Sequence, residues 1–188
     1  MVALRDGSRV LVRPVRPDDK ELFVRGWQRF GEESRYRRFM GAKGGLTKRD
    51  LAYFTEVDHV DHEALGALDA ETGEGVGVAR YVRLGEGSDV AEAAVAVVDD
   101  WQGRGLGGAL LRRLTRRARE HGIDRFHASL FAFNKGMLAL FGGLGEMTVR
   151  RGGGMDEIEI DVELPCESGD CLQTALRAAA EGQVGLRP

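Results

Sequence analysis

Apolar residues occur along this chain either in short continuous runs or at helical spacing. The runs mark the expected strands, and the helical spacing marks the expected helices. Short apolar runs between turn residues predict strands at Arg9–Arg13, Glu63–Asp69, Val76–Leu84, Val90–Val98, Arg125–Phe133, Met147–Arg151 and Glu157–Leu164. Helical spacing, with start and stop signals, predicts helices at Pro17–Phe30, Glu32–Met40, Thr47–Glu56, Arg104–His121 and Asn134–Gly142.

The connections between these elements predict how the strands pair. The polar link Ala70–Gly75 and the glycine turn Gly152–Gly154 each join two strands as an antiparallel hairpin. The helix at Arg104–His121 lies between two strands and makes a β-α-β crossover, whose strands run parallel. The expected fold class is therefore α/β (α+β), with a mixed, mostly antiparallel sheet, one parallel β-α-β crossover and flanking helices.

The segment Asp99–Gly108 carries the clearest sign of chemistry, because it is rich in glycine and joins a strand directly to a helix. Glycine backbones can turn successive N–H groups toward an anion, and the start of a helix adds partial positive charge. The preceding run, Ala93–Val98, is continuously apolar, which is typical of a strand covered on both faces. We therefore expect a cradle for the pyrophosphate of a cofactor.

Two kinds of site share this glycine spacing. Gly103, Gly105 and Gly108 spell G-x-G-x-x-G, but a dinucleotide site opens its fold and has an acidic residue about 20 positions later. Here the glycines lie past mid-chain, and the next strand does not end in an acid. Gln102–Gly107 instead matches the Q/R-x-x-G-x-G/A signature, so the chain resembles the GNAT superfamily of acetyl-CoA-dependent N-acetyltransferases.

Upstream segments narrow this resemblance. Leu11–Asp19, Glu33–Phe39 and Glu56–His62 are similar to the catalytic domain of bacterial Pat-type protein lysine acetyltransferases, and the similarity covers Arg9–Leu164. Relatives of this type often carry a fused regulatory domain, for which 188 residues leave no room. We expect a GNAT acetyltransferase domain at residues 1–165 and a C-terminal tail at 166–188, which can form a helix over Gly169–Gly182.

The resemblance implies a GNAT-like fold, acetyl-CoA as the acetyl donor, and no metal. The backbone of Val97 would stabilise the oxyanion that forms when an amine attacks the thioester. Asn134 would bond the pantetheine arm or, with equal weight, cap its own helix. The residues expected to bind acetyl-CoA are Val95, Val97, Gln102, Gly103, Arg104, Gly105, Leu106, Gly107, Gly108 and Asn134.

Attack by a lysine amine needs a base, because the amine is almost wholly protonated at neutral pH. Glu92 is the expected catalytic base, since its strand leads to the glycine loop and it matches the glutamate position of related lysine acetyltransferases. The alternative is a strand carboxylate paired with an arginine, and Asp89 and Glu86 are less well placed. Many relatives carry a tyrosine where this chain has Phe141, so reprotonation of the CoA thiolate falls to water.

Acidic residues and histidines gather just before the second long strand, at Asp58, His59, Asp61, His62 and Glu63. This cluster could attract a cationic lysine, and either histidine could assist proton transfer. The alternative, which we favour, is a capped and solvated turn. With Cys166 and Cys171 the histidines supply four zinc-type ligands, but their spacing fits no zinc-finger pattern.

Composition excludes several classes of protein. The formal net charge of -3 and the pI near 5.9 argue against a general nucleic-acid binder. Arginines interleave with aromatics at Glu32–Met40, and in an acidic chain this favours an amphipathic helix with a solvated cationic face over an RNA site. The chain has no apolar run of membrane-spanning length and no signal segment, so we expect a cytoplasmic, single-domain protein.

The function expected from these residues is transfer of the acetyl group of acetyl-CoA to a primary amine, with a protein lysine as the first acceptor. A small-molecule amine, a protein N-terminus or a non-catalytic CoA-sensing module remain as alternatives. The expected partners are a CoA thioester, an amine acceptor and a second copy of the chain, without nucleic acid or membrane. Lys135 follows Asn134 and would be the first lysine to acetylate itself if its side chain turned toward the thioester, whereas the commoner alternative is a side chain that points to solvent.

Overall fold

The structure of the protein is a computed structural model that describes residues 1–165. The predicted tail helix Gly169–Gly182 and the two cysteines lie outside the described residues. In chain order the elements are β1 (Val2–Ala3), β2 (Arg9–Pro14), a 3₁₀ turn (Pro17–Asp19), α1 (Lys20–Gln28), α2 (Glu32–Phe39), α3 (Lys48–Thr55), β3 (His62–Asp69), β4 (Gly75–Arg83), β5 (Val90–Val97), a second 3₁₀ turn (Asp99–Trp101), α4 (Leu106–Glu120), β6 (Arg125–Phe131), α5 (Lys135–Gly142), β7 (Met147–Arg151) and β8 (Glu157–Glu163).

Within residues 1–165 the strands form one eight-stranded sheet in the order β1-β2-β3-β4-β5-β6-β8-β7. Each neighbouring pair is antiparallel except β5 and β6, which are parallel and joined through α4. The predicted mixed sheet, both hairpins and the single crossover are confirmed. β8 pairs with β6 and leaves β7 at the edge, where its polar and charged side chains face solvent.

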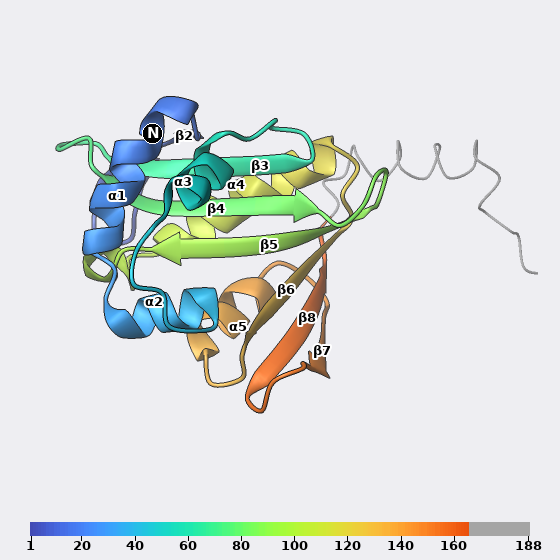
Figure 1. The fold of residues 1–188 in the computed structure, drawn as a ribbon. Coiled ribbons are helices and arrows are strands. Elements are labelled where there is room, and N and C mark those ends of the chain that lie inside the picture. Colours follow the sequence, from blue (N-terminus) through green and yellow to red (C-terminus); the bar gives the residue numbers. More distant parts are fainter. Residues whose placement is uncertain (166–188) are drawn as a thin grey trace, which may run out of the picture.

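Helices cover the two faces of the sheet differently. α4 packs on one face, and α1 and α3 lie across the other (Figure 1). We call these the α4 face and the α1–α3 face. β5 alternates between them: Ala91, Ala93 and Val95 are buried on the α4 face, whereas Glu92 is exposed on the α1–α3 face. The prediction that Ala93–Val98 is covered on both faces is confirmed in part, because none of these residues is exposed but Ala94 and Ala96 on the second face are only half-buried.

α4 lies close to the sheet because its apolar side chains meet a strand with little bulk. Leu106, Leu110 and Leu114 are fully buried, and each such side chain contributes roughly 1.5–3 kcal/mol when it leaves water. An added Cβ at Gly77 of β4 would lie 3.1 Å from Leu110 and 3.2 Å from Leu106. Glycine at this position thus lets α4, which follows the glycine loop, pack closely against the sheet.

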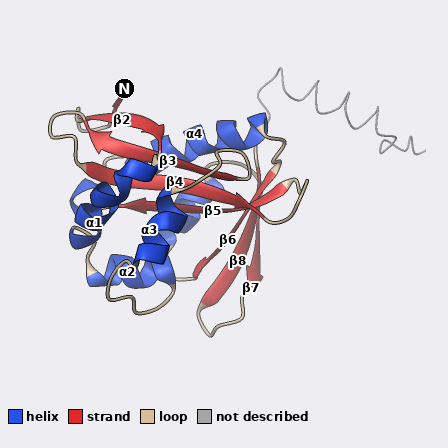
Figure 2. Cartoon of the chain, turned by 45° about the horizontal axis from the view of Figure 1, so that its top comes forward, coloured by secondary structure: helices blue, strands red, loops and turns tan. Residues whose placement is uncertain are grey.

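β5 and β6 pair over a short stretch only. Their register runs from Val90 opposite Arg125 to Glu92 opposite His127, and beyond that point the two strands diverge. Figure 2 shows β6, β8 and β7 fanning away from β5. The sheet therefore opens in its middle, beside the glycine loop.

Several boundaries differ from the predicted ones for local reasons. α4 begins at Leu106 rather than Arg104, because Gly105 has φ +89 and cannot continue a right-handed helix backward. The predicted helix Pro17–Phe30 is a 3₁₀ turn followed by α1. The two-residue strand β1 is too short to give a periodic signal, and it forms only by pairing with β2.

Candidate active site

The opening between β5 and β6 presents backbone groups to the interior of a cleft. The Val98 N–H donates to Val76 O, and Val90 O accepts from the Leu84 N–H, so the even-numbered residues of β5 bond to β4. In an antiparallel ladder alternate residues face opposite neighbours. The backbone groups of Val95 and Val97 therefore face the opening, where β6 no longer pairs with them.

This opening belongs to a cleft of about 530 Å³ between β5, β6, α2, α4 and α5. We call it the donor cleft. All ten residues predicted to bind acetyl-CoA line it, together with Ala94, Ala96, Ser129 and Leu140. Glu92 is outside this lining and lies beside the opening, at the last pair before the strands diverge. The structure thus brings the predicted binding residues to one place.

The glycine loop closes one end of the donor cleft. Gly103 and Gly105 both have positive φ, +75 and +89, which turn the chain sharply into α4. The first backbone N–H groups of a helix have no partner within it, so the start of α4 offers donors to an anion. Gly107 has a second role, because an added Cβ there would lie 3.1 Å from Leu140 of α5.

The side chains of Gln102 and Arg104 are engaged by the protein itself. Gln102 Nε2 donates to Val97 O and Asp99 Oδ1, both at 3.1 Å. Arg104 pairs with Asp6 at 3.1 Å, donates to Asp100 O at 2.7 Å and stacks on the Trp101 ring. Both side chains therefore stabilise the shape of the loop. The groups of the loop that remain free to bind a ligand are its backbone N–H groups.

Other cations line the donor cleft that sequence spacing did not indicate. Arg5 comes from the segment between β1 and β2, and Arg112 from the second turn of α4. Neither guanidinium makes a hydrogen bond or ion pair with another residue in the range 1–165. Arg37 of α2 also lines the cleft and pairs with Glu33. The N-terminal segment gave no periodic signal, because its place depends on β1 pairing at the sheet edge.

Two ionisable side chains, Arg38 of α2 and His127 of β6, lie near Glu92 on different sides. Burial lowers the pKa of the Arg38 guanidinium, and the nearby Glu92 carboxylate opposes that shift. On the other side, His127 stands opposite Glu92 in the β5–β6 register, and its Nδ1 lies 3.0 Å from Asp161 Oδ1 of β8. Parallel pairing with alternating side chains was the signal that could have placed His127 beside Glu92.

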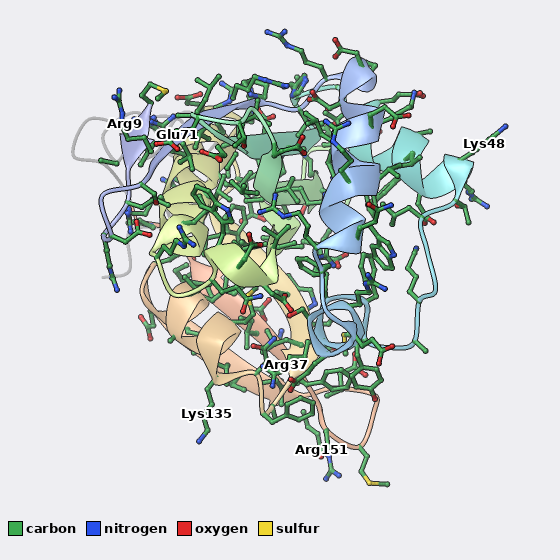
Figure 3. The ribbon with its side chains drawn as sticks, turned by 90° about the vertical axis from the view of Figure 1, so that its left-hand side faces the viewer. Arg9, Arg37, Lys48, Glu71, Lys135 and Arg151 are labelled. Carbon is green, nitrogen blue, oxygen red and sulfur yellow. The ribbon has the colours of Figure 1, made fainter. Side chains whose placement is uncertain are left out.

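α5 forms the far wall of the donor cleft. Asn134 lines the cleft, and its Oδ1 accepts from the Met137 N–H at 3.3 Å, so the capping alternative is present in the structure. Phe141 is fully buried and lines the same cleft, without a hydroxyl to offer. Lys135 is exposed and projects away from the molecule (Figure 3), so the solvent-facing alternative is the one that the structure shows.

The acidic cluster before β3 separates into two structures. Asp58 Oδ1 accepts from the N–H groups of Val60, Asp61 and His62, which confirms a capped turn. Glu63 is fully buried on the α4 face and binds His59 Nδ1 at 2.7 Å and Arg117 Nε at 2.9 Å. These groups therefore lie apart from the donor cleft.

His62 packs on the α1–α3 face against Tyr53 and Arg80. Burial, with a smaller contribution from the Arg80 charge, lowers the pKa of His62 to about 4. The imidazole is therefore neutral at neutral pH and is a weak base for an ammonium group.

The cationic face predicted for α2 is not fully solvated. Arg35 is partly buried, stacks on the Trp27 ring at 4.7 Å and donates to Trp27 O. Tyr36 instead stacks on Phe131 of β6 at 5.1 Å. α2 thus bridges the two halves of the divided sheet, which local periodicity could not show.

Residues 1–165 contain neither a cluster of metal ligands nor a membrane-spanning helix. No group of three or more His, Cys, Asp or Glu side chains there could hold a metal ion. None of the described helices combines the length and apolar content that a membrane span requires.

Comparison with known proteins places this cleft in a family. The sequence profile of the Acetyltransferase (GNAT) family matches residues 27–145, which include α2, the divided strands and the glycine loop. The chain belongs to the GNAT acetyltransferase family. This family uses acetyl-CoA as the acetyl donor, and the predicted resemblance to the GNAT superfamily is confirmed.

Individual relatives agree with this assignment. The chain is 36% identical over 161 residues to "Acetyltransferase Pat" of Mycolicibacterium smegmatis, covering 86% of this chain and 48% of that protein. It is similar to the crystal structure of the GNAT domain of S. lividans PAT, with a TM-score of 0.79 and 36% identity over 87% of this chain and 95% of that one. The predicted similarity to the catalytic domain of Pat-type proteins is confirmed.

A more distant solved structure shares the fold alone. The acetyltransferase yncA from Salmonella typhimurium, described "with its cofactor Acetyl-CoA", aligns with a TM-score of 0.65 at 20% identity, covering 85% of this chain and 96% of that one. This chain spans about half the length of the M. smegmatis protein.

Proposed function

We propose that this protein is an N-acetyltransferase that moves the acetyl group of acetyl-CoA to a primary amine, with a protein lysine as its acceptor. The observation that carries the proposal is the donor cleft, in which the backbone of Val95 and the N–H of Val97, unpaired with β6, lead to the glycine loop at the start of α4. The 36% identity to a Pat acetyltransferase supports the lysine acceptor.

The donor cleft fits acetyl-CoA in both size and chemistry. Its volume of about 530 Å³ lies in the range of pockets that hold an extended ligand. Backbone N–H groups at Gly103–Gly108 would bind the pyrophosphate, and the strand backbone would bind the pantetheine arm, with Asn134 at its side. The cations Arg5 and Arg112 add positive charge at the same end. When bound, acetyl-CoA supplies an activated acetyl thioester.

We assign the catalytic roles to Glu92 and to the backbone of Val97. Glu92 would accept the proton of the acceptor ammonium, which must be removed before its nitrogen can attack. The Val97 N–H would donate to the thioester oxygen as negative charge develops there, and a donor fixed in advance costs no reorganisation. The carboxylate is exposed and open to an incoming amine, which supports its role as a base.

Two measurements test this proposal. Calorimetry should detect binding of acetyl-CoA and CoA but not of NAD, because the loop has the context of an acyltransferase and lacks the ribose acid. Thiol release from acetyl-CoA should then require an added lysine peptide, and mass spectrometry should place the acetyl group on its ε-amine. If the protein bound NAD and did not bind CoA, the proposal that acetyl-CoA is the donor at this site would be wrong.

One observation favours a second candidate, a CoA-sensing module that binds the cofactor without turnover. Phe141 stands buried in the cleft wall and offers no proton donor to a leaving thiolate. A thiolate leaves well without help, so we rank the enzyme first. CoA binding without thiol release from any amine would reverse this ranking. The 1–165 domain boundary, a cytoplasmic location and a homodimer stay predictions from the sequence.

A further inference from the structure

We infer that the protein has a second acceptor class, small apolar amino acids, whose carboxylate binds Arg38 and whose side chain enters a cavity between α1, α3 and the sheet. The inference rests on the proposed acetyl transfer and adds a substrate to it. It begins from a cavity that the transfer of acetyl to a surface lysine does not use.

This second cavity, the acceptor cavity, has a volume of about 120 Å³ on the α1–α3 face. An apolar cavity of roughly 150 Å³ holds one benzene molecule, so this one has room for an aliphatic side chain of about four carbons. Side chains from three helices and β4 give it an apolar wall: Leu22, Phe23, Trp27, Phe39, Phe54 and Val78.

The charge of its lining is unbalanced. Four charged residues line the acceptor cavity, and two of them, Arg13 and Asp19, neutralise each other as an ion pair at 2.5 Å. Arg38 and Arg80 make no ion pair within residues 1–165, and the carboxylate that acts on Arg38 from nearby, Glu92, is outside the lining of this cavity. Arg80 donates to the carbonyl oxygen of Phe54 at 3.0 Å and to His62 Nε2 at 3.3 Å, which are both neutral acceptors.

The Arg38 guanidinium has the Glu92 carboxylate nearby but is not bonded to it. It stacks on the Phe39 ring at 5.2 Å and makes no hydrogen bond or ion pair with any residue in the range 1–165. Burial and the Arg38 charge lower the pKa of Arg80 to about 9, so Arg80 keeps its charge at neutral pH. Two close, poorly solvated cations favour an anionic ligand, and a planar guanidinium suits a carboxylate.

Position then decides which substrate carries this carboxylate. Arg38, Phe30 and Ala96 line both the acceptor cavity and the donor cleft, so the two spaces meet at Arg38. Glu92, Arg80 and the cavity lie on the same face of the sheet. Because the proposed base must meet the amine, a ligand on this face is the acceptor rather than the acyl donor. An amine beside a carboxylate and an apolar side chain describes an α-amino acid.

The reaction with leucine balances as an ordinary acetyl transfer. The ammonium loses one proton to Glu92, which passes it to water. The nitrogen then forms a bond to the acetyl carbon, and the C–S bond breaks with its electron pair on sulfur. The second proton lost by nitrogen ends on the thiol, so the products are N-acetylleucine, CoA and one proton.

The first experiment compares leucine, leucinamide and glycine as acceptors with acetyl-CoA, by thiol release and mass spectrometry. We expect kcat/KM for leucine to exceed that for leucinamide by about tenfold or more, because the amide lacks the charge that Arg38 binds. Leucine should exceed glycine by a similar factor, because only leucine fills the cavity.

Variants test separately the contact of the carboxylate with Arg38 and the contact of the side chain with the acceptor cavity. Arg38→Met should remove the preference for leucine over leucinamide, and Arg38→Lys should keep part of it. Gly66→Val should lower kcat/KM for leucine toward the glycine value, since an added Cβ there meets only Val15 at 3.5 Å and the rest of the side chain occupies the cavity. Arg9→Gln on β2 and Gly85→Val in an open loop are the matched controls.

The outcomes distinguish this inference from the proposed function. Acetylation of a lysine peptide with no turnover of leucine would overturn the inference and leave the proposed function standing. Equal rates for leucine and leucinamide would overturn the carboxylate contact. CoA binding with no acetylation of any amine would overturn the proposed function itself. Retention of the leucine preference in Arg38→Met would remove Arg38 from the site.

Discussion

Arg104 and Arg38 show how the partners of a residue, rather than its type, decide its role. Arg104 lies in the glycine signature, yet Asp6, Asp100 and Trp101 hold its side chain. The sequence predicts a solvated cationic face for the helix of Arg38. In the structure the Arg38 guanidinium makes no ion pair within residues 1–165 and borders both the acceptor cavity and the donor cleft. At the scale of single residues, the contacts that a side chain makes in the folded protein therefore decide what it can do.

Replacing Glu92 with glutamine should lower kcat for an amine acceptor at neutral pH by about 10²- to 10⁴-fold, the usual contribution of a general base. The affinity for acetyl-CoA should change little, because Glu92 is outside the lining of the donor cleft. The loss should shrink as pH rises, since hydroxide increasingly deprotonates the amine. Glu86→Gln, an exposed loop substitution, is the control, and an unchanged pH–rate profile in Glu92→Gln would assign the base elsewhere.

Replacing Gly105 with alanine should weaken CoA binding measured by calorimetry, because Gly105 has φ +89 at the start of α4 and its backbone faces the cleft. The left-handed conformation costs a non-glycine residue about 1–2 kcal/mol. Gly122→Ala is the matched control, since Gly122 has φ +72 at the other end of α4 with open space around it. Both variants should lose stability, but a similar loss of CoA affinity in both would refute the loop's role.

His62 should make the protein less stable in mild acid. Its pKa is about 4 in the folded state against 6.5 for the free side chain, so the unfolded chain binds more protons between these values. The stability associated with neutral His62 is therefore complete above pH 6.5 and is lost as pH falls toward 4. Urea unfolding across this window should show a flatter pH dependence for His62→Gln. An identical slope in both proteins would contradict the assignment.

At the scale of elements, the distance between α4 and the sheet determines where the glycine loop sits. Gly77 of β4 sets this distance, because an added Cβ would come within 3.2 Å of Ala96 O as well as of two leucines. α5 is fixed in the same way, through the contact of Leu140 with Gly107. Small residues thus place both walls of the donor cleft.

Substituting Gly77 with alanine should destabilise the protein by about 1–3 kcal/mol, the usual cost of overpacking a core. Gly66→Ala on β3 is the comparison, because its added Cβ meets Val15 at an ordinary 3.5 Å. It should be neutral or slightly stabilising in the same urea unfolding measurement. Equal effects of the two substitutions would show that α4 can shift without cost.

At the scale of the whole molecule, the donor cleft exists because one sheet is divided in its middle. α2 spans the division, with Tyr36 stacked on Phe131 of β6 and Phe39 packed near Trp27 of α1. The hydrophobic core runs through both halves and includes Phe126 and Ile160. Residues 1–165 therefore contain a continuous core together with every residue of the proposed site.

A chain that ends at Pro165 should fold and bind CoA with the affinity of the full chain. Its thermal midpoint and its calorimetric affinity for CoA would be compared with those of the 188-residue protein. A large loss of either would show that the domain does not end near residue 165.

The sequence by itself determined what depends on neighbours along the chain. The strand, glycine loop and helix from Val90 to Glu120 are contiguous, so their periodicity and turn residues predicted the parallel strands and the backbone donors of the glycine loop. The choice between an acyltransferase and a dinucleotide site likewise needed only the order of segments, the absence of one acid and the resemblance of Gln102–Gly107 to the GNAT signature.

Tertiary structure alone decided which distant side chains share a face. A shift of one residue in strand register moves a side chain to the opposite side of a sheet. The observed register buries Glu63 on the α4 face, and it brings His127 beside Glu92. Arg38 reaches the junction of the two cavities because α2 folds back across the divided sheet. Local pattern could not fix these positions, because packing between segments far apart in the chain sets them.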